Sequence, residues 1–250
     1  MSDEAFFALF HEGLPRLGPG TDIDTAQALS LVHGLPPSPT ILDVGCGNGA
    51  QTLALARLLP EAEITAVDLH GHFLVELERR ASRAKCLDRL RIIQGDMGDL
   101  AFEPGSFDLV WSEGAAYHIG FAKALASWRR LVRPGGSVAL SHICWFKPDP
   151  PEELRAFWDL EYPDMVFEAE HERQAEDAGY MIDGHFRLSA QSWWTEYYAP
   201  LSEELLRFCA SNANKPDWLA VADMVRRELD MHRRYGDWYG YTFFVCRRPD

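Results

Sequence analysis

The stretch ILDVGCGNGA, residues 41–50, joins an apolar run to three glycines spaced by two residues. The apolar run predicts a buried strand over 40–44, and the pattern after the glycines predicts a helix over 50–59. Glycine lacks a side chain and tolerates positive φ, so a ligand can lie directly on the backbone of such a turn. The start of the following helix offers free N–H groups to anionic ligand atoms. The stretch therefore predicts a strand–turn–helix unit that holds a ligand.

The same alternation of strand and helix continues along the chain. Strand-like runs occupy residues 63–68, 90–94, 107–111 and 137–143, with helical runs over 72–84 and 121–132. The RPGG stretch at 133–136 is expected to end the last of these helices. A helical stretch follows over 152–178, and runs at 179–188 and 241–247 have the pattern of strands that complete the sheet. This order predicts an α/β fold with a mostly parallel sheet and helices on both faces.

The length of 250 residues fits one large α/β domain with an added lobe. Residues 1–39 are interpreted as an N-terminal helical segment, whose loop at 16–20 closes one side of the site. Residues 40–250 form the main domain. Its mostly helical insertion, residues 190–236, is too long for a plain connection and is expected to cover the site.

The composition restricts the classes of partner. Lys and Arg number 24 against 38 Asp and Glu, which gives a formal net charge of −14. A surface that follows nucleic-acid phosphates needs a basic field, so we expect no nucleic-acid partner. The five cysteines include no C-x-x-C pair, which predicts neither a disulfide framework nor a metal site. The acidic N-terminus and the lack of a long apolar run indicate a cytoplasmic protein without a membrane partner. The pattern does not predict an oligomeric state.

Polar or small residues follow the first four predicted strands, where an open parallel sheet binds its ligands. These residues are Gly45, Gly47 and Gly49, then Asp68, then Asp96 with Met97, then Glu113. Asp68 is suited to accept hydrogen bonds from a ribose diol, and Asp96 from an adenine amino group. The glycine spacing, with an acid 21 residues after Gly47, also fits a dinucleotide fingerprint. A nicotinamide-dependent oxidoreductase therefore remains an alternative at this point, as does a glycine loop that binds no nucleotide.

Four motifs in a fixed order resemble those of class I S-adenosylmethionine-dependent methyltransferases. They are LDVGCGNG (42–49), VDL (67–69), GDM (95–97) and LVRPGG (131–136). Three further stretches, WSEGAAYHIGF (111–121), WWTEYYAP (193–200) and YGYTFF (239–244), resemble uncharacterised bacterial methyltransferases that act on small molecules. The resemblance implies a Rossmann-like sheet of seven strands with the last strand antiparallel. It also implies S-adenosyl-L-methionine as cofactor and S-adenosyl-L-homocysteine as product.

The resemblance also implies roles for the residues at the strand ends. Gly45 and Gly47 would hold the methionine moiety, Asp68 the ribose, and Leu69, Asp96 and Met97 would border the adenine. Glu113 would end the strand nearest the methyl group. Asp43 and Gly49 complete the expected cofactor-binding set.

Methyl transfer from a sulfonium depends mainly on positioning, and a base is needed only for a protonated acceptor. Glu113 and His118 are the catalytic candidates, and Tyr117, Trp194 and Tyr198 are the candidates for substrate binding. Each also has a structural interpretation as loop support or packing, and the aromatic group at 193–198 is either a lid or part of a core. The sequence predicts a methyltransferase for a small-molecule acceptor. The alternatives are a nicotinamide-dependent oxidoreductase and a protein that binds S-adenosylmethionine without transferring its methyl group.

Overall fold

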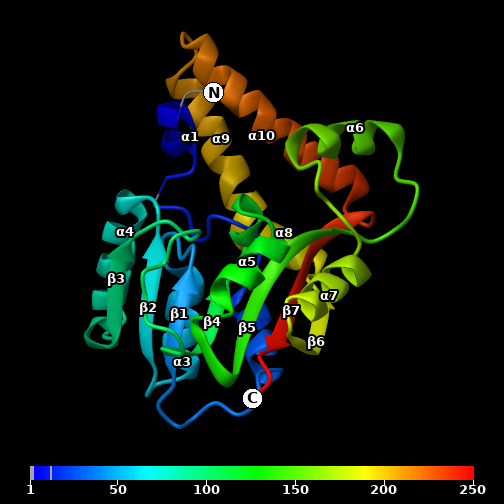
Figure 1. Cartoon of the computed structure of the whole chain (residues 1–250). Coiled ribbons are helices and arrows are strands. Elements are labelled where there is room, and N and C mark those ends of the chain that lie inside the picture. Colours follow the sequence, from blue (N-terminus) through cyan, green and yellow to red (C-terminus); the bar gives the residue numbers. More distant parts are fainter. Residues whose placement is uncertain (1–2, 12) are drawn as a thin grey trace.

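The computed structural model describes residues 3–11 and 13–250 (Figure 1). The α-helices are α1 (Asp3–Leu9), α2 (Asp22–Ser30), α3 (Ala50–Leu58), α4 (Gly71–Arg83), α5 (Phe121–Trp128), α6 (Glu152–Glu161), α7 (Glu168–Asp177), α8 (Ala190–Trp193), α9 (Ala199–Ser211) and α10 (Pro216–Tyr235). Two 3-10 turns, η1 (Leu87–Arg89) and η2 (Ala116–His118), and a π-helical segment, η3 (Trp194–Tyr198), complete the helical elements. The strands are β1 (Thr40–Val44), β2 (Glu63–Asp68), β3 (Leu90–Gln94), β4 (Phe107–Ser112), β5 (Val132–Trp145), β6 (Met181–Arg187) and β7 (Tyr239–Arg247).

All seven of these strands form one sheet in the order β3-β2-β1-β4-β5-β7-β6. The neighbours from β3 to β5 pair in parallel, while β7 is antiparallel to both β5 and β6. The predicted α/β fold class is therefore confirmed, including the antiparallel last strand. The bounds of β1, β2 and β3 agree with the predicted ranges, because each is a short apolar run between clear turn signals.

Three predicted ranges are wrong. The helix predicted over 121–132 ends at Trp128. The stretch 133–136 was expected to be a loop, but β5 begins at Val132 and includes it. The proline and glycines lie at a shift in the register between β4 and β5. Val132 pairs with Phe107, whereas Ser137, five residues later, pairs with Leu109, only two residues after Phe107. The helical stretch predicted over 152–178 is divided into α6 and α7, because Pro163 disfavours helix at the residue before it. The segment between the two helices forms a bridge from Phe167 to Trp145.

The core lies on both faces of the sheet. Alternation along β1 and β4 sends Ile41 and Trp111 into one buried cluster, and Leu42 and Val110 into the other. The first cluster continues into the helices at the top of Figure 1, where α1, α9 and α10 pack together beyond one edge of the sheet. The second cluster is covered by α5 and α7. None of the helices in the described residues is long and apolar enough to cross a lipid bilayer.

Candidate functional site

The glycine turn after β1 has a backbone that only glycine adopts readily. Gly45, Gly47 and Gly49 have φ angles of 73°, 52° and 87°. The N–H of Gly45 donates to the carbonyl of Val67 at 2.8 Å, which ties the turn to β2. A side chain at Gly45 would also have no space, because its Cβ would lie 2.4 Å from Cβ of Ala115. The turn therefore brings bare backbone to the carboxyl ends of β1 and β4.

Asp68 ends β2 beside this turn. Its Oδ2 accepts a hydrogen bond from the N–H of Gly47 at 2.8 Å, and its Oδ1 accepts one from the N–H of His70 at 2.9 Å. A carboxylate offers about four acceptor positions. About two therefore remain, which matches the two hydroxyl donors of a ribose diol.

The predicted adenine-side residues surround the ends of β2 and β3. Leu69 follows Asp68 and is 56% exposed, so an apolar side chain is available for a planar base to cover. The Asp96 carboxylate accepts a hydrogen bond from the N–H of Gly98 at 2.8 Å. The carbonyl of Met97 accepts one from Nε1 of Trp128 at 3.0 Å. These bonds fix the loop after β3 and place Met97 close to the glycine turn, 3.4 Å from the position of a Cβ on Gly45.

Asp43 lies behind the glycine turn. Its carboxylate is fully buried and accepts hydrogen bonds from Oγ1 of Thr52 at 2.5 Å and from Nε2 of Gln51 at 3.3 Å. Burial raises the pKa of Asp43 to about 7. The sequence analysis expected Asp43 to contact the cofactor. In the structure this side chain instead joins β1 to the start of α3 and supports the turn from inside.

Glu113, which follows β4, is held by three donors. Its Oε2 accepts from Nη1 of Arg16 at 3.0 Å, and its Oε1 accepts from Oγ1 of Thr25 at 2.7 Å and from Nε1 of Trp111 at 2.9 Å. The side chains of Glu113 and Arg16 are each only 4% exposed. A carboxylate engaged in this way is poorly placed to take a proton from an acceptor, so the arrangement favours a positioning role.

Arg16 joins three parts of the molecule. Besides Glu113, it pairs with Asp22 at 3.1 Å and with Glu196 of η3 at 3.0 Å. The next residue, Leu17, lies against the glycine turn, with its Cδ1 3.0 Å from the position of a Cβ on Gly47. The N-terminal segment therefore covers the turn and is bound by ion pairs to the end of β4 and to η3.

Tyr117 and His118 occupy η2, directly after the β4 loop. Their rings lie 4.1 Å apart, and the Tyr117 ring meets that of Tyr162 edge-on at 6.2 Å. Burial lowers the pKa of His118, and within the described residues its ring has no hydrogen-bond partner. Burial, and next the charge of Glu228, raises the pKa of Tyr117 to about 12, although 36% of this residue is accessible. In the described residues, no hydrogen-bond partner therefore competes with an acceptor for the His118 ring.

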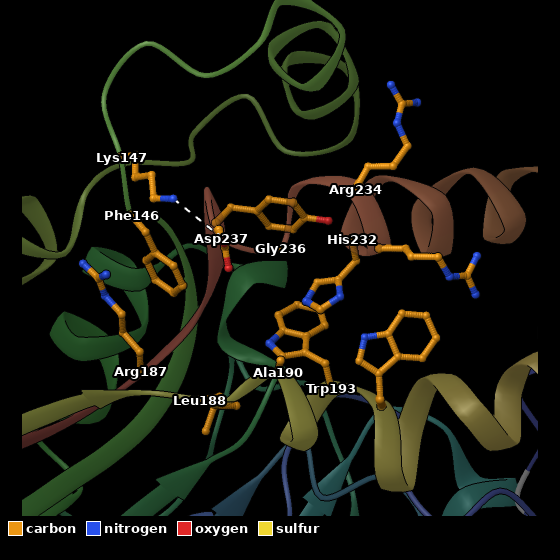
Figure 2. Close-up of a pocket in the computed structure, with 13 residues that line it drawn as sticks. Phe146, Lys147, Arg187, Leu188, Ala190, Trp193, His232, Arg234, Gly236 and Asp237 are labelled. Atoms are coloured by element: carbon orange, nitrogen blue, oxygen red, sulfur yellow. Dashed lines mark ion pairs between the residues drawn. The ribbon is translucent and has the colours of Figure 1, made fainter.

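The aromatic side chains of η3, Trp194 and Tyr198, lie in two different surroundings. Trp194 lines an open cavity of about 670 Å³, whose lining also includes Phe146, Trp193, His232 and Tyr239 (Figure 2). Tyr198 is 1% exposed, and its hydroxyl donates a hydrogen bond to Oε1 of Glu228 at 2.8 Å. Trp194 and Tyr198, which were both expected to bind substrate, have ring centroids 5.3 Å apart. Trp194 nevertheless borders the cavity, whereas Tyr198 is buried against Glu228.

The comparisons with known proteins agree with this geometry. A family model described as a methyltransferase domain matches residues 41–136, which include the glycine turn, Asp68 and Glu113. Over these residues the chain is therefore similar to a methyltransferase domain. A solved methyltransferase from Geobacter sulfurreducens, in complex with S-adenosyl-L-homocysteine, shares this fold. It is 21% identical, with a TM-score of 0.82 over 99% of this chain and 98% of that one.

Two curated relatives match more locally. The malonyl-[acyl-carrier protein] O-methyltransferase of Dechloromonas aromatica is 32% identical over 155 residues, which are 61% of this chain and 55% of the relative. The trans-aconitate 2-methyltransferase of Deinococcus radiodurans is 34% identical over 122 residues, which are 48% of this chain and 44% of the relative. The chain therefore spans about half the length of these methyltransferases.

Several residues of the site were missed by the sequence analysis. Arg16 lies in a loop that was recognised, but nothing in the sequence indicates that this arginine meets Glu113. Glu228 and Tyr241 have the pattern of an ordinary helix residue and an ordinary strand residue. Their contribution depends on the packing of α10 and β7. Among the described residues, no group of His, Cys, Asp and Glu has the arrangement of a metal site.

Proposed function

We propose that this protein is an S-adenosylmethionine-dependent methyltransferase with a small-molecule acceptor. The observation that carries the proposal is the direct bond from the Gly47 N–H to Asp68, which joins a bare backbone turn to a carboxylate with free acceptor positions. This pairing brings the two groups that would hold the ends of a nucleoside ligand to the same edge of the sheet. S-adenosylmethionine, when bound, would supply a methyl group activated on a sulfonium.

The residues present fit this cofactor. Gly45 and Gly47 leave the backbone open, and Asp68 keeps about two acceptor positions for ribose hydroxyls. Leu69 and Met97 provide apolar surface for a base. Asp43 and Gly49 would support the turn, because Asp43 is buried behind it and Gly49 has no space for a side chain beside Leu77.

A small-molecule acceptor is favoured by how the site is covered. The Arg16 segment lies over the glycine turn, and η3 is joined to that segment through Glu196. A long polymer would have to displace these contacts. The net charge of −14 opposes a nucleic-acid acceptor as well. The relative from Deinococcus radiodurans is named for a small molecule, trans-aconitate, which supports the same class.

His118 is the candidate base for an acceptor that arrives protonated. Desolvation lowers its pKa, and its ring is free of hydrogen bonds within the described residues. Glu113 would act indirectly, by holding Arg16 and the covering segment in place.

Two measurements test the proposed function. Calorimetry should show binding of S-adenosyl-L-homocysteine and no binding of NADH, which separates a methyltransferase from a nicotinamide-dependent oxidoreductase. The transfer of label from methyl-labelled S-adenosylmethionine to a small molecule in a metabolite extract then separates an enzyme from a protein that only binds the cofactor. Binding of NADH alone, or cofactor binding without transfer to any fraction, would contradict the proposal.

A further inference from the structure

Glu228 is a carboxylate that lacks a positively charged partner. It lies on α10, where the hydroxyl of Tyr198 donates to it at 2.8 Å. No Lys, Arg or His of the described residues forms an ion pair with it, and the nearby charge of Glu161 makes its surroundings more negative. Burial raises the pKa of Glu228. A charge in this position is costly to bury unless a cation accompanies it.

An aromatic cluster lies beside this carboxylate. The Tyr198 ring stacks on Tyr197 with centroids 4.8 Å apart, and Trp193 contacts Tyr198 at 5.5 Å and Tyr241 at 5.2 Å. Burial and the charge of Glu228 also raise the pKa of Tyr117, Tyr197, Tyr198, Tyr239 and Tyr241. The faces of aromatic rings carry negative charge density and attract cations. An acid beside several tyrosines is therefore a favourable environment for an organic cation, and residues 3–11 and 13–250 supply no cationic side chain in an ion pair with it.

Two tyrosines of this cluster have hydroxyls without a partner in the described part of the chain. Tyr197 and Tyr241 are each only 7% exposed, and within the described residues neither hydroxyl has a hydrogen-bond partner. Both hydroxyls are therefore available to a polar group of a ligand.

This cluster adjoins the proposed methyl-transfer site. The Tyr241 ring lies 3.2 Å from the position of a Cβ on Gly114, the residue after Glu113. Ala115 in turn meets the glycine turn at Gly45. A ligand held by Glu228 and the tyrosines would therefore lie on the acceptor side of the cofactor.

The open cavity beside Trp194 is less informative. Each of the four Lys and Arg side chains at its rim already has a carboxylate partner. Lys147 pairs with Asp237 (Figure 2). Arg187 pairs with Glu168, Arg233 with Asp230 and Arg234 with Glu153. These charges are balanced within the protein, whereas the charge of Glu228 is not.

We propose that the methyl acceptor carries a positively charged nitrogen, an amine or quaternary ammonium group, that binds between the Glu228 carboxylate and the surrounding tyrosine rings. This inference rests on the proposed function and names the substrate class of the same site. It concerns binding of the nitrogen and assigns no accepting atom.

The test uses choline and its uncharged isostere 3,3-dimethylbutan-1-ol, which have the same shape but differ in charge. Both are titrated into the protein saturated with S-adenosyl-L-homocysteine, whose sulfur is uncharged. The wild type should bind choline at least about tenfold more tightly than the isostere. Glu228→Gln should abolish this preference while leaving the affinity for S-adenosyl-L-homocysteine unchanged. Glu203→Gln, an equal change of charge at an exposed position of α9, should leave the preference intact.

A second variant keeps the acid and removes a ring. Tyr117→Leu should weaken choline binding about threefold or more without changing the binding of the isostere. Equal binding of choline and the isostere, no binding of choline, or a Glu228→Gln variant that binds choline as the wild type does would overturn the inference. Failure of the proposed function has a different signature, since it removes binding of S-adenosyl-L-homocysteine while the preference for choline persists.

Discussion

The carboxyl ends of the strands, where the candidate ligand groups lie, form two halves that are built in different ways. On the half formed by β1, β2 and β3, the candidate ligand groups are backbone atoms and acids that follow strands directly. On the half formed by β5 and β7, they are side chains from distant parts of the chain, including Tyr117, Glu228 and Tyr241. The half built from backbone atoms suits a ligand that does not vary. Substitutions of side chains in the other half can change its ligand without disturbing the first half. We therefore expect the first half to hold the cofactor and the second half to determine the specificity for the acceptor.

The largest expected effect tests the cofactor half. Asp68→Ala removes the acceptor for ribose hydroxyls and the bond that holds the Gly47 N–H. Hydrogen bonds to a carboxylate contribute roughly 1.5–3 kcal/mol each, so affinity for S-adenosyl-L-homocysteine should fall by about two to four powers of ten. Calorimetry measures this loss. Asp99→Ala, an exposed acid near the same edge, is the control, and a change below about threefold in a folded Asp68→Ala variant would remove the assignment.

The cofactor half was largely predictable from the sequence for a physical reason. Strands β1, β2 and β3 are short, apolar and bounded by turn residues, so local pattern determines their ranges. Gly45 and Asp68 follow strands directly, and parallel topology brings such strand ends together. Asp43 was assigned to the ligand face because sequence distance shows that it is close to the turn, but not on which side of the turn it lies.

The other half depends on contacts between segments that are far apart in the sequence. Glu228 meets Tyr198 only because α10 packs on η3, and Arg16 meets Glu113 across 97 positions. The amphipathic pattern of α10 predicts a helix with one buried face, but not which acid points inward without a cation. The division of α6 from α7 has instead a local signal, because Pro163 disfavours helix at Tyr162.

The next effect tests the contact that joins the two halves. Arg16→Ala leaves Glu113 buried without its cation, and loss of one partner of a buried pair costs about 3–5 kcal/mol. The free energy of unfolding in urea should fall by this amount. Arg57→Ala removes an exposed arginine that pairs with Asp22 and should cost about 1 kcal/mol or less. Equal losses in the two variants would show that the Arg16 contact does not hold the halves together.

A smaller effect tests the acceptor half alone. Tyr198→Phe removes the hydroxyl bonded to Glu228, and a hydrogen bond to a charged group contributes about 1.5–3 kcal/mol. Stability and turnover should fall while affinity for S-adenosyl-L-homocysteine stays the same. Tyr235→Phe is the matched control, because this hydroxyl donates to the exposed Glu153 at 3.0 Å. If Tyr198→Phe changed cofactor affinity as much as turnover, the two halves would not be separable.

The smallest effect distinguishes the halves by the sign of their pH dependence. Burial raises the pKa of Asp43 from 3.8 to about 7, so within this range the folded state binds a proton that the unfolded state lacks, and acidification adds stability. Burial lowers the pKa of His142 from 6.5 to about 3, so the unfolded state binds the extra proton and acidification removes stability. Each group contributes about 1.4 kcal/mol per pH unit within its window. Between about pH 6.5 and pH 5 the two contributions oppose each other.

On acidification, Asp43→Asn should therefore lower the free energy of unfolding relative to wild type, and His142→Gln should raise it. Urea unfolding at three pH values in this range measures both slopes, and variants whose slopes match the wild type would show that neither group titrates as its burial requires.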